Sequence, residues 1–183
     1  KNKFPLIVKP RIGSTSKNVY LVKNHDELKK AIDRCKKPII QEYMYYKNNE
    51  YTCGTLMRNK KILSCLALKR KLKNGNTVKA TLENNSVSKL INKFLINITS
   101  KINPDGPLNF QLCFKNNKPY IFEINPRFSG TTPLREIFGL NEIEIYINSF
   151  LNKKKKSIKL KEGTILRYFE DYFIKKKNYK WTA

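Results

Sequence analysis

The side chains of Gln111, Glu123 and Asn125 offer one carboxylate and two amide groups within a short part of this sequence, and Arg127 follows closely. Mg²⁺ prefers hard oxygen ligands, usually takes only one or two carboxylates from a protein, and completes its octahedron with phosphates and water. These residue types beside a cation are typical of a site that holds a magnesium ion against a phosphate. Such a site requires a structural element that brings the side chains together.

A β-hairpin within residues 106–130 is the element that we expect to do this. Apolar and polar residues alternate with period 2 on both sides of Asn116, Asn117 and Lys118, which we expect to form the loop. The predicted pairs are Phe110–Ile124, Leu112–Phe122 and Phe114–Tyr120 on an apolar face, and Asn109–Asn125 and Gln111–Glu123 on a polar face. A slip of one residue would scramble both faces, so the pattern favours a loop of odd length.

An ordinary edge hairpin with polar groups facing water is the alternative, and it accounts well for any one of these residues. It accounts less well for the whole set. Strands tend to avoid asparagine, yet Asn109 and Asn125 both fall on the face that carries Gln111 and Glu123. The combination therefore favours a functional site.

The segment FEINPRFSG, residues 122–130, also resembles the C-terminal signature of the ATP-grasp superfamily, and most closely the carbamoyl-phosphate-synthetase-like branch of carboxylate–amine ligases. The resemblance covers nearly the whole chain. It implies that Gln111, Glu123 and Asn125 bind the metal ions that bridge the phosphates of ATP, which would be Mg²⁺ or Mn²⁺. It also implies that Arg127 lies near the transferred phosphoryl group.

Other residues fall where the resemblance implies a nucleotide site. Lys9 ends a buried-type strand before a loop rich in turn formers, where an ammonium group can act as a point charge on phosphates. Glu42, Tyr43 and Met44 resemble the connector whose backbone pairs with the adenine edge, and Glu50 fits the ribose-binding glutamate. For Lys9 the competing interpretation is an ordinary surface lysine. For residues 42–44 it is an ordinary edge strand.

Lys69 and Arg70 end an otherwise apolar strand, where a cation could meet the γ-phosphate or an acyl-phosphate intermediate. Exposed charges at a strand end are the competing explanation in a lysine-rich chain. Ser129, Gly130 and Thr131 predict a flexible turn near the acceptor substrate. We take Lys69, together with Arg127, as the candidate catalytic residues.

The net charge raises a different function. The 183 residues include 38 Lys+Arg and 14 Asp+Glu, which gives +24, and such a charge favours nucleic-acid binding in general. However, the excess is almost all lysine, is spread along the chain, and comes with abundant Asn and Ile, a mixture that codon usage in an AT-rich genome produces. We therefore expect no specific nucleic-acid partner, but we do expect salt-sensitive, non-specific binding of polyanions.

Cysteine and histidine usage excludes other chemistries. The four cysteines, Cys35, Cys53, Cys65 and Cys113, are too far apart for a zinc knuckle or a C-x-x-C redox pair, so we expect reduced thiols and a cytoplasmic location. The single histidine, His25, leaves no material for a Ser-His-Asp triad. No apolar run approaches the length of a membrane span, and we expect no membrane partner.

The order of expected elements predicts an α+β fold with largely antiparallel sheets. Helices are expected over residues 26–36, with Asn24 as N-cap, over 87–102, and over 132–151; a last strand is expected over 164–174. The resemblance implies an ATP-grasp fold, in which two α+β lobes clasp a nucleotide. We assign residues 1–44 to the small lobe and residues 45–183 to the large lobe that carries the metal and phosphate platform.

The sequence thus predicts an ATP-dependent carboxylate–amine ligase or a carbamoyl-phosphate-synthetase-like enzyme with small-molecule carboxylate and amine substrates. A basic nucleic-acid-binding module without catalysis is the alternative from another class. An inactive nucleotide-binding fragment is the third, since the chain begins with Lys1 and enters a strand almost at once. We therefore expect that an N-terminal part of a longer chain is missing.

Overall fold

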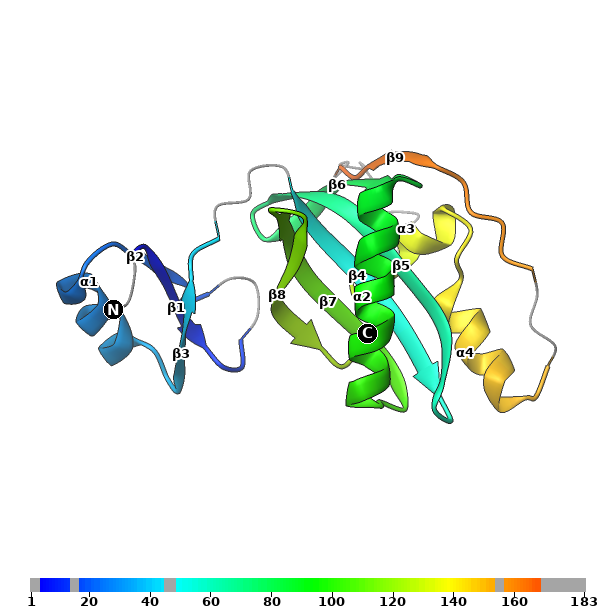
Figure 1. The fold of residues 1–183 in the computed structure, drawn as a ribbon, viewed down its shortest axis with the longest axis horizontal. Coiled ribbons are helices and arrows are strands. Elements are labelled where there is room, and N and C mark those ends of the chain that lie inside the picture. Colours follow the sequence, from blue (N-terminus) through cyan, green and yellow to red (C-terminus); the bar gives the residue numbers. More distant parts are fainter. Residues whose placement is uncertain (1–3, 14–16, 45–48, 154–156, 169–183) are drawn as a thin grey trace, which may run out of the picture.

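The computed structural model describes residues 4–13, 17–44, 49–153 and 157–168. Within these ranges the chain forms two antiparallel β-sheets that lie side by side, with helices packed on both (Figure 1). This arrangement confirms the predicted α+β class with largely antiparallel sheets.

The smaller sheet has the strand order β2-β1-β3 and carries one helix. Its elements are β1 (Leu6–Pro10), β2 (Tyr20–Val22), α1 (His25–Arg34) and β3 (Pro38–Glu42). Ala31 of the helix packs on Val8 and Val22 of the strands. The predicted N-cap is confirmed, because the side chain of Asn24 accepts a hydrogen bond of 2.9 Å from the backbone N–H of Glu27.

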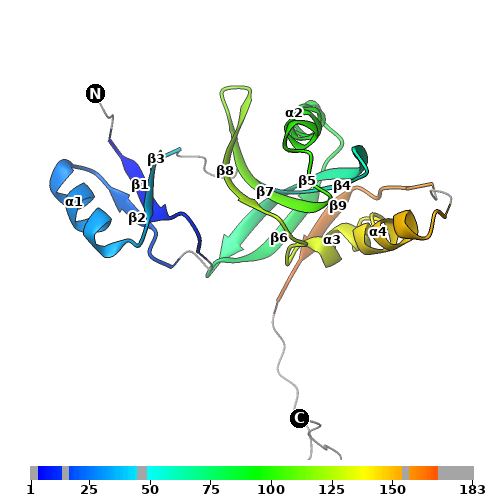
Figure 2. The ribbon, with the colours of Figure 1, turned by 90° about the horizontal axis from the view of Figure 1, so that it is seen from below.

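The larger sheet has the strand order β8-β7-β4-β5-β6-β9. Its elements are β4 (Glu50–Arg58), β5 (Lys61–Lys73), β6 (Asn76–Leu82), α2 (Ser86–Ile102), β7 (Gly106–Lys115), β8 (Lys118–Asn125), α3 (Thr132–Ile137), α4 (Glu142–Phe150) and β9 (Gly163–Leu166). The helix α2 lies on one face of this sheet, and α3 and α4 lie on the other (Figure 2).

Each face of the larger sheet has its own hydrophobic core. On the α2 side, Ile91 and Leu95 pack with Phe110 of the sheet. On the α3 side, Leu134 packs with Leu68. Because side chains alternate along a strand, β5 contributes Ala67 to the first core and Leu68 to the second, and the apolar α2 side fixes which residues point the other way.

The hairpin of β7 and β8 confirms the predicted register at the end far from the turn. There the pairs are Asn109–Asn125, Phe110–Ile124 and Gln111–Glu123. Near the turn the pairs are Leu112–Ile121, Cys113–Tyr120 and Phe114–Pro119, so the predicted pairs Leu112–Phe122 and Phe114–Tyr120 are wrong. The loop has two residues instead of three, because Asn116 and Asn117 both adopt a positive φ, of 49° and 57°.

A β-bulge reconciles the short turn with the predicted polar face. The register shifts next to Leu112, which leaves Phe122 as the extra residue of β8. Ile121 consequently packs against the α2-side core. An even turn followed by one bulge thus gives the same polar pairs that an odd loop without a bulge would have given.

Other elements also differ from the prediction. The strand β6, for which the sequence analysis gave no expectation, follows the turn at Asn74 and Gly75. The helix expected over 132–151 is divided into α3 and α4, because Gly139 adopts a φ of 101°. The strand expected over 164–174 ends at Leu166 as β9, and its residues from 169 onwards lie outside the described ranges.

The helix α2 ends as expected, since Asn103 caps it in the left-handed region with a φ of 53°. The proposed boundary between residues 1–44 and 45–183 falls at the edge of residues 45–48, which the structure does not describe. The division into two lobes agrees with the two separate sheets, and its position stays a prediction.

Candidate nucleotide and metal site

The predicted metal ligands meet on the face of the larger sheet that carries α3 and α4. One carboxylate oxygen of Glu123, Oε1, accepts a hydrogen bond of 2.9 Å from Nε2 of Gln111 and one of 2.6 Å from Nδ2 of Asn125. The three residues lie together because Gln111 pairs directly with Glu123, and Asn125 follows two positions later on the same face of β8.

Arg70 and Glu50 extend this cluster across two more strands. Nε of Arg70 lies 2.8 Å from Oε1 of Glu50, Nη2 also donates to that oxygen, and Nη2 lies 2.5 Å from Oε1 of Gln111. The side chains of Arg70 and Glu50 are only 7% and 14% exposed. We call Arg70, Glu50, Gln111, Glu123 and Asn125 the polar row.

Lys69 does not join the polar row, and the catalytic role expected for it from sequence stays a prediction. It pairs with Tyr51 across β4 and β5, and the Tyr51 side chain belongs to the α2-side core. Since paired residues share a face, Lys69 lies on the opposite face from Glu123. The neighbouring residue, Arg70, is therefore the cation of this strand end that reaches the site.

Lys9 approaches the polar row from the smaller sheet. Its Nζ lies 2.5 Å from the carbonyl oxygen of Phe122 and 5.9 Å from the centre of the Phe122 ring. Burial lowers the pKa of Lys9 below its usual value, while the nearby Glu123 carboxylate acts in the opposite direction. Both sheets thus contribute a cation to the same region.

The connector residues Glu42, Tyr43 and Met44 lie at the end of β3. The backbone N–H of Tyr43 donates 3.2 Å to the carbonyl oxygen of Pro5. Among the described residues, β3 pairs only with β1, so its second edge presents backbone donors and acceptors. A strand edge of this kind can form hydrogen bonds with a flat heterocycle, as the resemblance implies.

Arg127 follows the polar row but is not hydrogen-bonded to it. The residue is exposed, and its Nη1 donates 3.1 Å to the carbonyl oxygen of Phe128 within its own turn. Behind this turn, Oγ of Ser129 lies 2.7 Å from Oγ1 of Thr131, and Thr131 in turn contacts Thr52 at 3.2 Å. The turn after Arg127 is therefore tied to the sheet.

A buried ion pair that the sequence interpretation missed supports this turn. Nε of Arg135 lies 2.8 Å from Oε2 of Glu142, and the two side chains are only 1% and 2% exposed. The Arg135 guanidinium also donates 3.0 Å to Oγ1 of Thr131 and 3.0 Å to Oγ1 of Thr132. The sequence signal for this ion pair was Gly54, because a glycine inside a strand often marks a place where another group approaches the backbone closely.

The donor chemistry of the polar row fits a magnesium or manganese ion. Glu123 supplies a carboxylate, and the amide of Asn125 presents its oxygen when it rotates by half a turn. The amide oxygen of Gln111 accepts from Arg70 in this structure, so it would reach a metal ion only if that contact opens. The described residues contain no group of three or more His, Cys, Asp or Glu side chains able to hold a metal, so a metal ion at the polar row would complete its ligands with amide oxygens, phosphates or water. Hard oxygens suit Mg²⁺ and Mn²⁺.

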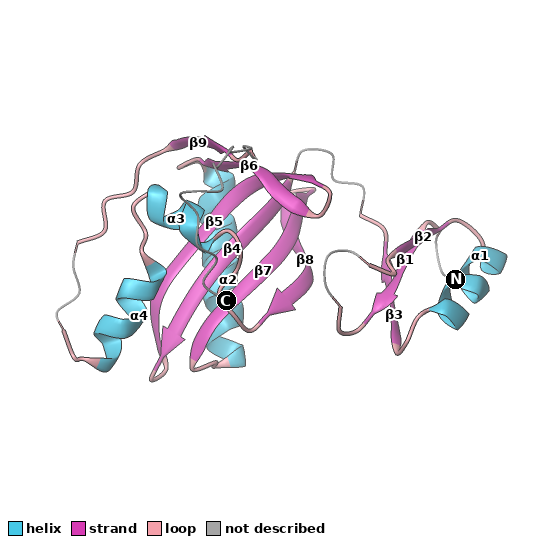
Figure 3. Cartoon of the chain, turned by 180° about the vertical axis from the view of Figure 1, so that it is seen from behind, coloured by secondary structure: helices cyan, strands magenta, loops and turns pink. Residues whose placement is uncertain are grey.

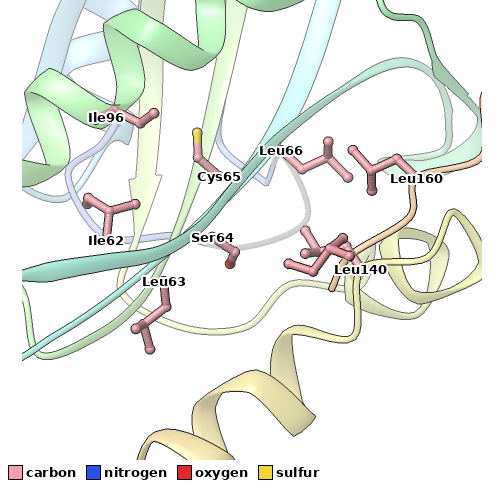
Figure 4. A pocket seen from close by; sticks show the side chains of 9 residues that line it. Ile62, Leu63, Ser64, Cys65, Leu66, Ile96, Leu140 and Leu160 are labelled. Carbon is pink, nitrogen blue, oxygen red and sulfur yellow. The ribbon is translucent and has the colours of Figure 1, made fainter. Parts of the chain in front are cut away.

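Figure 3 looks onto the face with the polar row. The helices α3 and α4 lie toward one side of it, and within the described ranges no helix crosses β7 and β8 there. An apolar pocket of about 300 Å³ lies elsewhere, between the first residues of β5 (62–66) and the side chains of Ile96, Leu140 and Leu160 (Figure 4). No residue of the polar row lines that pocket.

A pair of α+β lobes with a carboxylate, amides and an arginine on one sheet, and a lysine reaching over from the other, defines a candidate site for phosphates and a metal ion. The chain belongs to the ATP-grasp superfamily. The family described as ATP-grasp in the biosynthetic pathway with Ter operon matches residues 34–172. A search of the curated proteins gave no match.

Solved structures share this fold. N5-carboxyaminoimidazole synthetase from Staphylococcus aureus, complexed with ADP, superposes with a TM-score of 0.70 at 19% identity, over 86% of this chain and 44% of the other. Biotin carboxylase from Campylobacter jejuni, in a nucleotide complex, gives 0.71 at 17% identity, over 88% and 40%. The biotin carboxylase domain of the 2-oxoglutarate carboxylase from Hydrogenobacter thermophilus, with MgADP and bicarbonate, gives 0.66 at 12%, over 88% and 40%.

These values confirm the ATP-grasp fold and show that this chain spans less than half the length of each of these three proteins. The part of the chain that the structure describes contains no helix long and apolar enough to cross a membrane.

Proposed function

We propose that this chain binds Mg-ATP and is the nucleotide-binding part of an ATP-dependent ligase that joins a carboxylate, or bicarbonate, to an amine. The observation that carries the proposal is the polar row together with Lys9, since it gathers a metal-binding oxygen set and two cations on one face between the sheets. Family membership and the nucleotides present in the similar structures support it.

In the proposed reaction, a carboxylate oxygen attacks the γ-phosphorus of ATP, the bond from that phosphorus to the bridging oxygen breaks, and ADP leaves. The amine nitrogen then attacks the carbonyl carbon of the acyl phosphate, phosphate leaves, and the nitrogen loses a proton. The carbamoyl-phosphate-synthetase-like branch, with bicarbonate as the carboxylate, follows the same first step. No protein nucleophile is needed, which agrees with the absence of a histidine-based triad from the sequence.

The residues of this chain would position and neutralise charge. Glu123, Asn125 and Gln111 would hold the metal ion, which when bound offsets the negative charge of the phosphates. Lys9 and Arg127 would add positive charge near the phosphates. The edge of β3 at 42–44 would receive the adenine.

Two roles inferred from sequence change in this proposal. Arg70 takes the role of the strand-end cation that the sequence assigned to Lys69, because Arg70 faces the polar row. Arg70 donates a hydrogen bond to the Glu50 carboxylate in this structure. Glu50 can therefore accept hydrogen bonds from the ribose hydroxyls only if it keeps its contact with Arg70 at the same time or gives that contact up.

Calorimetric titration of ATP with and without Mg²⁺, at moderate salt, tests the proposal on the full chain. We expect Mg²⁺ to tighten ATP binding to the wild type by about tenfold or more, and we expect Glu123→Gln to lose this effect of Mg²⁺. Glu162→Gln, an exposed carboxylate elsewhere, is the matched control and should bind as wild type. Equal Mg²⁺ dependence in both variants would refute the metal site.

Inorganic triphosphate separates the proposal from its alternatives. Binding that needs the adenosine part supports a nucleotide site. Equal binding of triphosphate that disappears as salt rises would mean that the charge of +24 merely attracts polyanions. If binding is specific but Mg-dependent turnover of ATP is absent with any carboxylate and amine, the inactive-fragment alternative is favoured.

A further inference from the structure

A network of buried polar side chains lies on the same face of the larger sheet as the polar row. The members that are at most 5% exposed are Glu142, Arg135, Thr132, Thr131, Thr52 and Asn109. Ser129, which is partly buried, joins them through its hydroxyl group. The face is the same because Thr52 pairs with Gln111 across β4 and β7, and Asn109 pairs with Asn125 across β7 and β8. We call these seven residues, Ser129 included, the buried network.

Arg135 holds the turn at residues 129–132 through three hydroxyl groups. Its Nη1 donates 3.0 Å to Oγ1 of Thr131. Its Nη2 donates 3.0 Å to Oγ1 of Thr132 and 3.3 Å to Oγ of Ser129. A guanidinium group can only donate, and its planar fork has a fixed geometry. Arg135 therefore makes each of these hydroxyl oxygens an acceptor.

The hydroxyl hydrogens of the buried network consequently point from Arg135 toward Asn109. A hydroxyl group has one hydrogen to donate. Thr52 gives its hydrogen to Oδ1 of Asn109 at 3.2 Å, so the 3.2 Å contact between Thr52 and Thr131 requires Thr131 to donate. The hydrogen of Thr131 is then used, so the 2.7 Å contact between Thr131 and Ser129 requires Ser129 to donate.

The opposite order of donors does not satisfy the buried network. Asn109 would have to turn its amide by half a turn and donate to Thr52, and every hydroxyl along the network would then donate toward Ser129. The hydrogen of Ser129 would have no acceptor in the network, because the backbone N–H of Thr131 and Nη2 of Arg135, which also contact its oxygen, are donors. Arg135 thus selects the orientation of the Asn109 amide in which the oxygen faces Thr52.

This orientation matters for the polar row because Asn109 is the cross-strand partner of Asn125. Paired side chains on neighbouring antiparallel strands have Cβ atoms about 5 Å apart, so they limit each other's positions. With its oxygen held by Thr52, Asn109 has only its NH2 group left for the side of β8. The buried network therefore decides which group of Asn109 a neighbour on β8 meets.

We infer that Arg135 is a positioning residue of the proposed nucleotide and metal site. It fixes the turn at residues 129–132, which follows Arg127, and it fixes the amide of Asn109 beside the metal-binding residue Asn125. The inference rests on the proposed function, because it gives the network a role in binding Mg-ATP. A buried ion pair often stabilises a fold no better than apolar residues of the same size, so stability alone does not account for this network.

Thr131→Val and Thr131→Ser test the inference by calorimetric titration of ATP with Mg²⁺ on the full chain. Valine keeps the shape of the side chain and removes the hydroxyl between Arg135 and Thr52, whereas serine keeps the hydroxyl. Thr131→Val should bind Mg-ATP about tenfold more weakly than wild type, because partners behind metal ligands commonly contribute that much. Thr131→Ser should recover most of the loss. Arg135→Lys, which lacks the fork, should behave like Thr131→Val.

Thr99→Val is the matched control for the loss of a buried hydroxyl. Thr99 is fully buried on the α2 side of the same sheet, and its Oγ1 donates 3.0 Å to Oγ1 of Thr55. This variant also deletes a buried bond between two threonines, but on the face away from the polar row. It should lower the denaturant midpoint and leave Mg-ATP binding unchanged. All titrations are made where circular dichroism shows each variant to be folded.

The side-chain NH2 signals of Asn109 report on the buried network without nucleotide. They are identified in an amide NMR spectrum by their loss in Asn109→Asp. Thr131→Val should shift these signals, Thr131→Ser should return them toward their wild-type positions, and Thr99→Val should leave them in place. Signals that do not move in Thr131→Val would show that the network does not control the Asn109 amide, and would overturn the inference.

The binding data separate a failure of this inference from a failure of the proposed function. If wild type binds Mg-ATP and Thr131→Val binds equally well, Arg135 is not a positioning residue, and the ligase proposal stands. The same conclusion follows if Thr131→Val and Thr99→Val weaken binding equally, since the loss is then one of general packing. If wild type binds no Mg-ATP, the ligase proposal itself fails, and the role of Arg135 in nucleotide binding fails with it.

Discussion

Nζ of Lys9, in the smaller sheet, lies 2.5 Å from the carbonyl oxygen of Phe122, the bulge residue of the larger sheet. A bulge locally disrupts the backbone hydrogen bonds between two strands, and here the carbonyl oxygen of the bulge residue accepts a hydrogen bond from a lysine instead. The bulge thus has two effects: it restores the register of Gln111 and Glu123, and it links the two sheets through a candidate phosphate-binding residue.

Lys9→Met is expected to weaken ATP binding and to abolish the uptake of a proton that accompanies ATP binding to the wild type. Burial lowers the pKa of Lys9 from 10.5, so the free protein begins to lose this proton at a lower pH than an ordinary lysine does. A phosphate group nearby favours the charged form and raises the pKa of Lys9 again, so ATP binding should take up a proton in the pH range below 10.5 in which the free protein has lost it. Titrations in buffers of different ionisation enthalpy measure this uptake.

Lys17→Met is the control for that titration, because it removes the same charge at an exposed position. If Lys9→Met and Lys17→Met bind ATP equally and show the same proton uptake, Lys9 has no part in the nucleotide site.

Arg70→Lys and Lys69→Arg distinguish the two cations of the same strand end. Both substitutions keep the charge. Lysine cannot reproduce the forked contact that Arg70 makes with Glu50 and Gln111, so Arg70→Lys should weaken Mg-ATP binding by about tenfold, as expected for a lost charged hydrogen bond. Lys69→Arg should have little effect, and the reverse ranking would restore the sequence-based assignment.

Gly54→Ala should destabilise the fold. A Cβ at this position would collide with Oε1 of Glu142 and lie 2.7 Å from Cζ of Arg135, and neither partner of a buried ion pair can move freely. We expect a loss of roughly 1–3 kcal/mol in the free energy of unfolding, measured by denaturant titration. Gly130→Ala is the matched control, because a Cβ there meets nothing within 4 Å, and it should unfold as wild type does.

The free energy of unfolding should decrease as pH rises above 9.0, and Cys65 should account for part of the decrease. Burial raises the pKa of the Cys65 thiol to about 12, and burial also raises the pKa of Cys53. Above pH 9.0 the unfolded chain loses these protons while the folded chain keeps them, so ionisation favours unfolding.

Denaturant titrations on either side of pH 9.0 measure this slope, with Cys65→Ala as the comparison. The variant should start from a lower stability, because it leaves a small cavity, and lose less of it with pH. An identical slope in both proteins would show that Cys65 does not keep its proton in the folded state.

Local features of the sequence determined much of this protein. The period-2 pattern predicted that Gln111 faces Glu123 and Asn109 faces Asn125, because an apolar core on one side fixes what points to the other. Asn24 marked the start of the first helix through a hydrogen bond that involves only near neighbours. The signature around Glu123 indicated the family, which the comparison with known proteins confirms.

Only the tertiary structure decided which of Lys69 and Arg70 reaches the polar row, since the face of β5 depends on its register with β4. The same holds for the bulge at Phe122 and for the ion pair of Arg135 and Glu142 above Gly54. Each of these features arises where strands or helices distant in sequence come into contact. The alternation of side chains along one strand does not identify the distant residues that will pack against it. These contacts could therefore be assigned only from the folded structure.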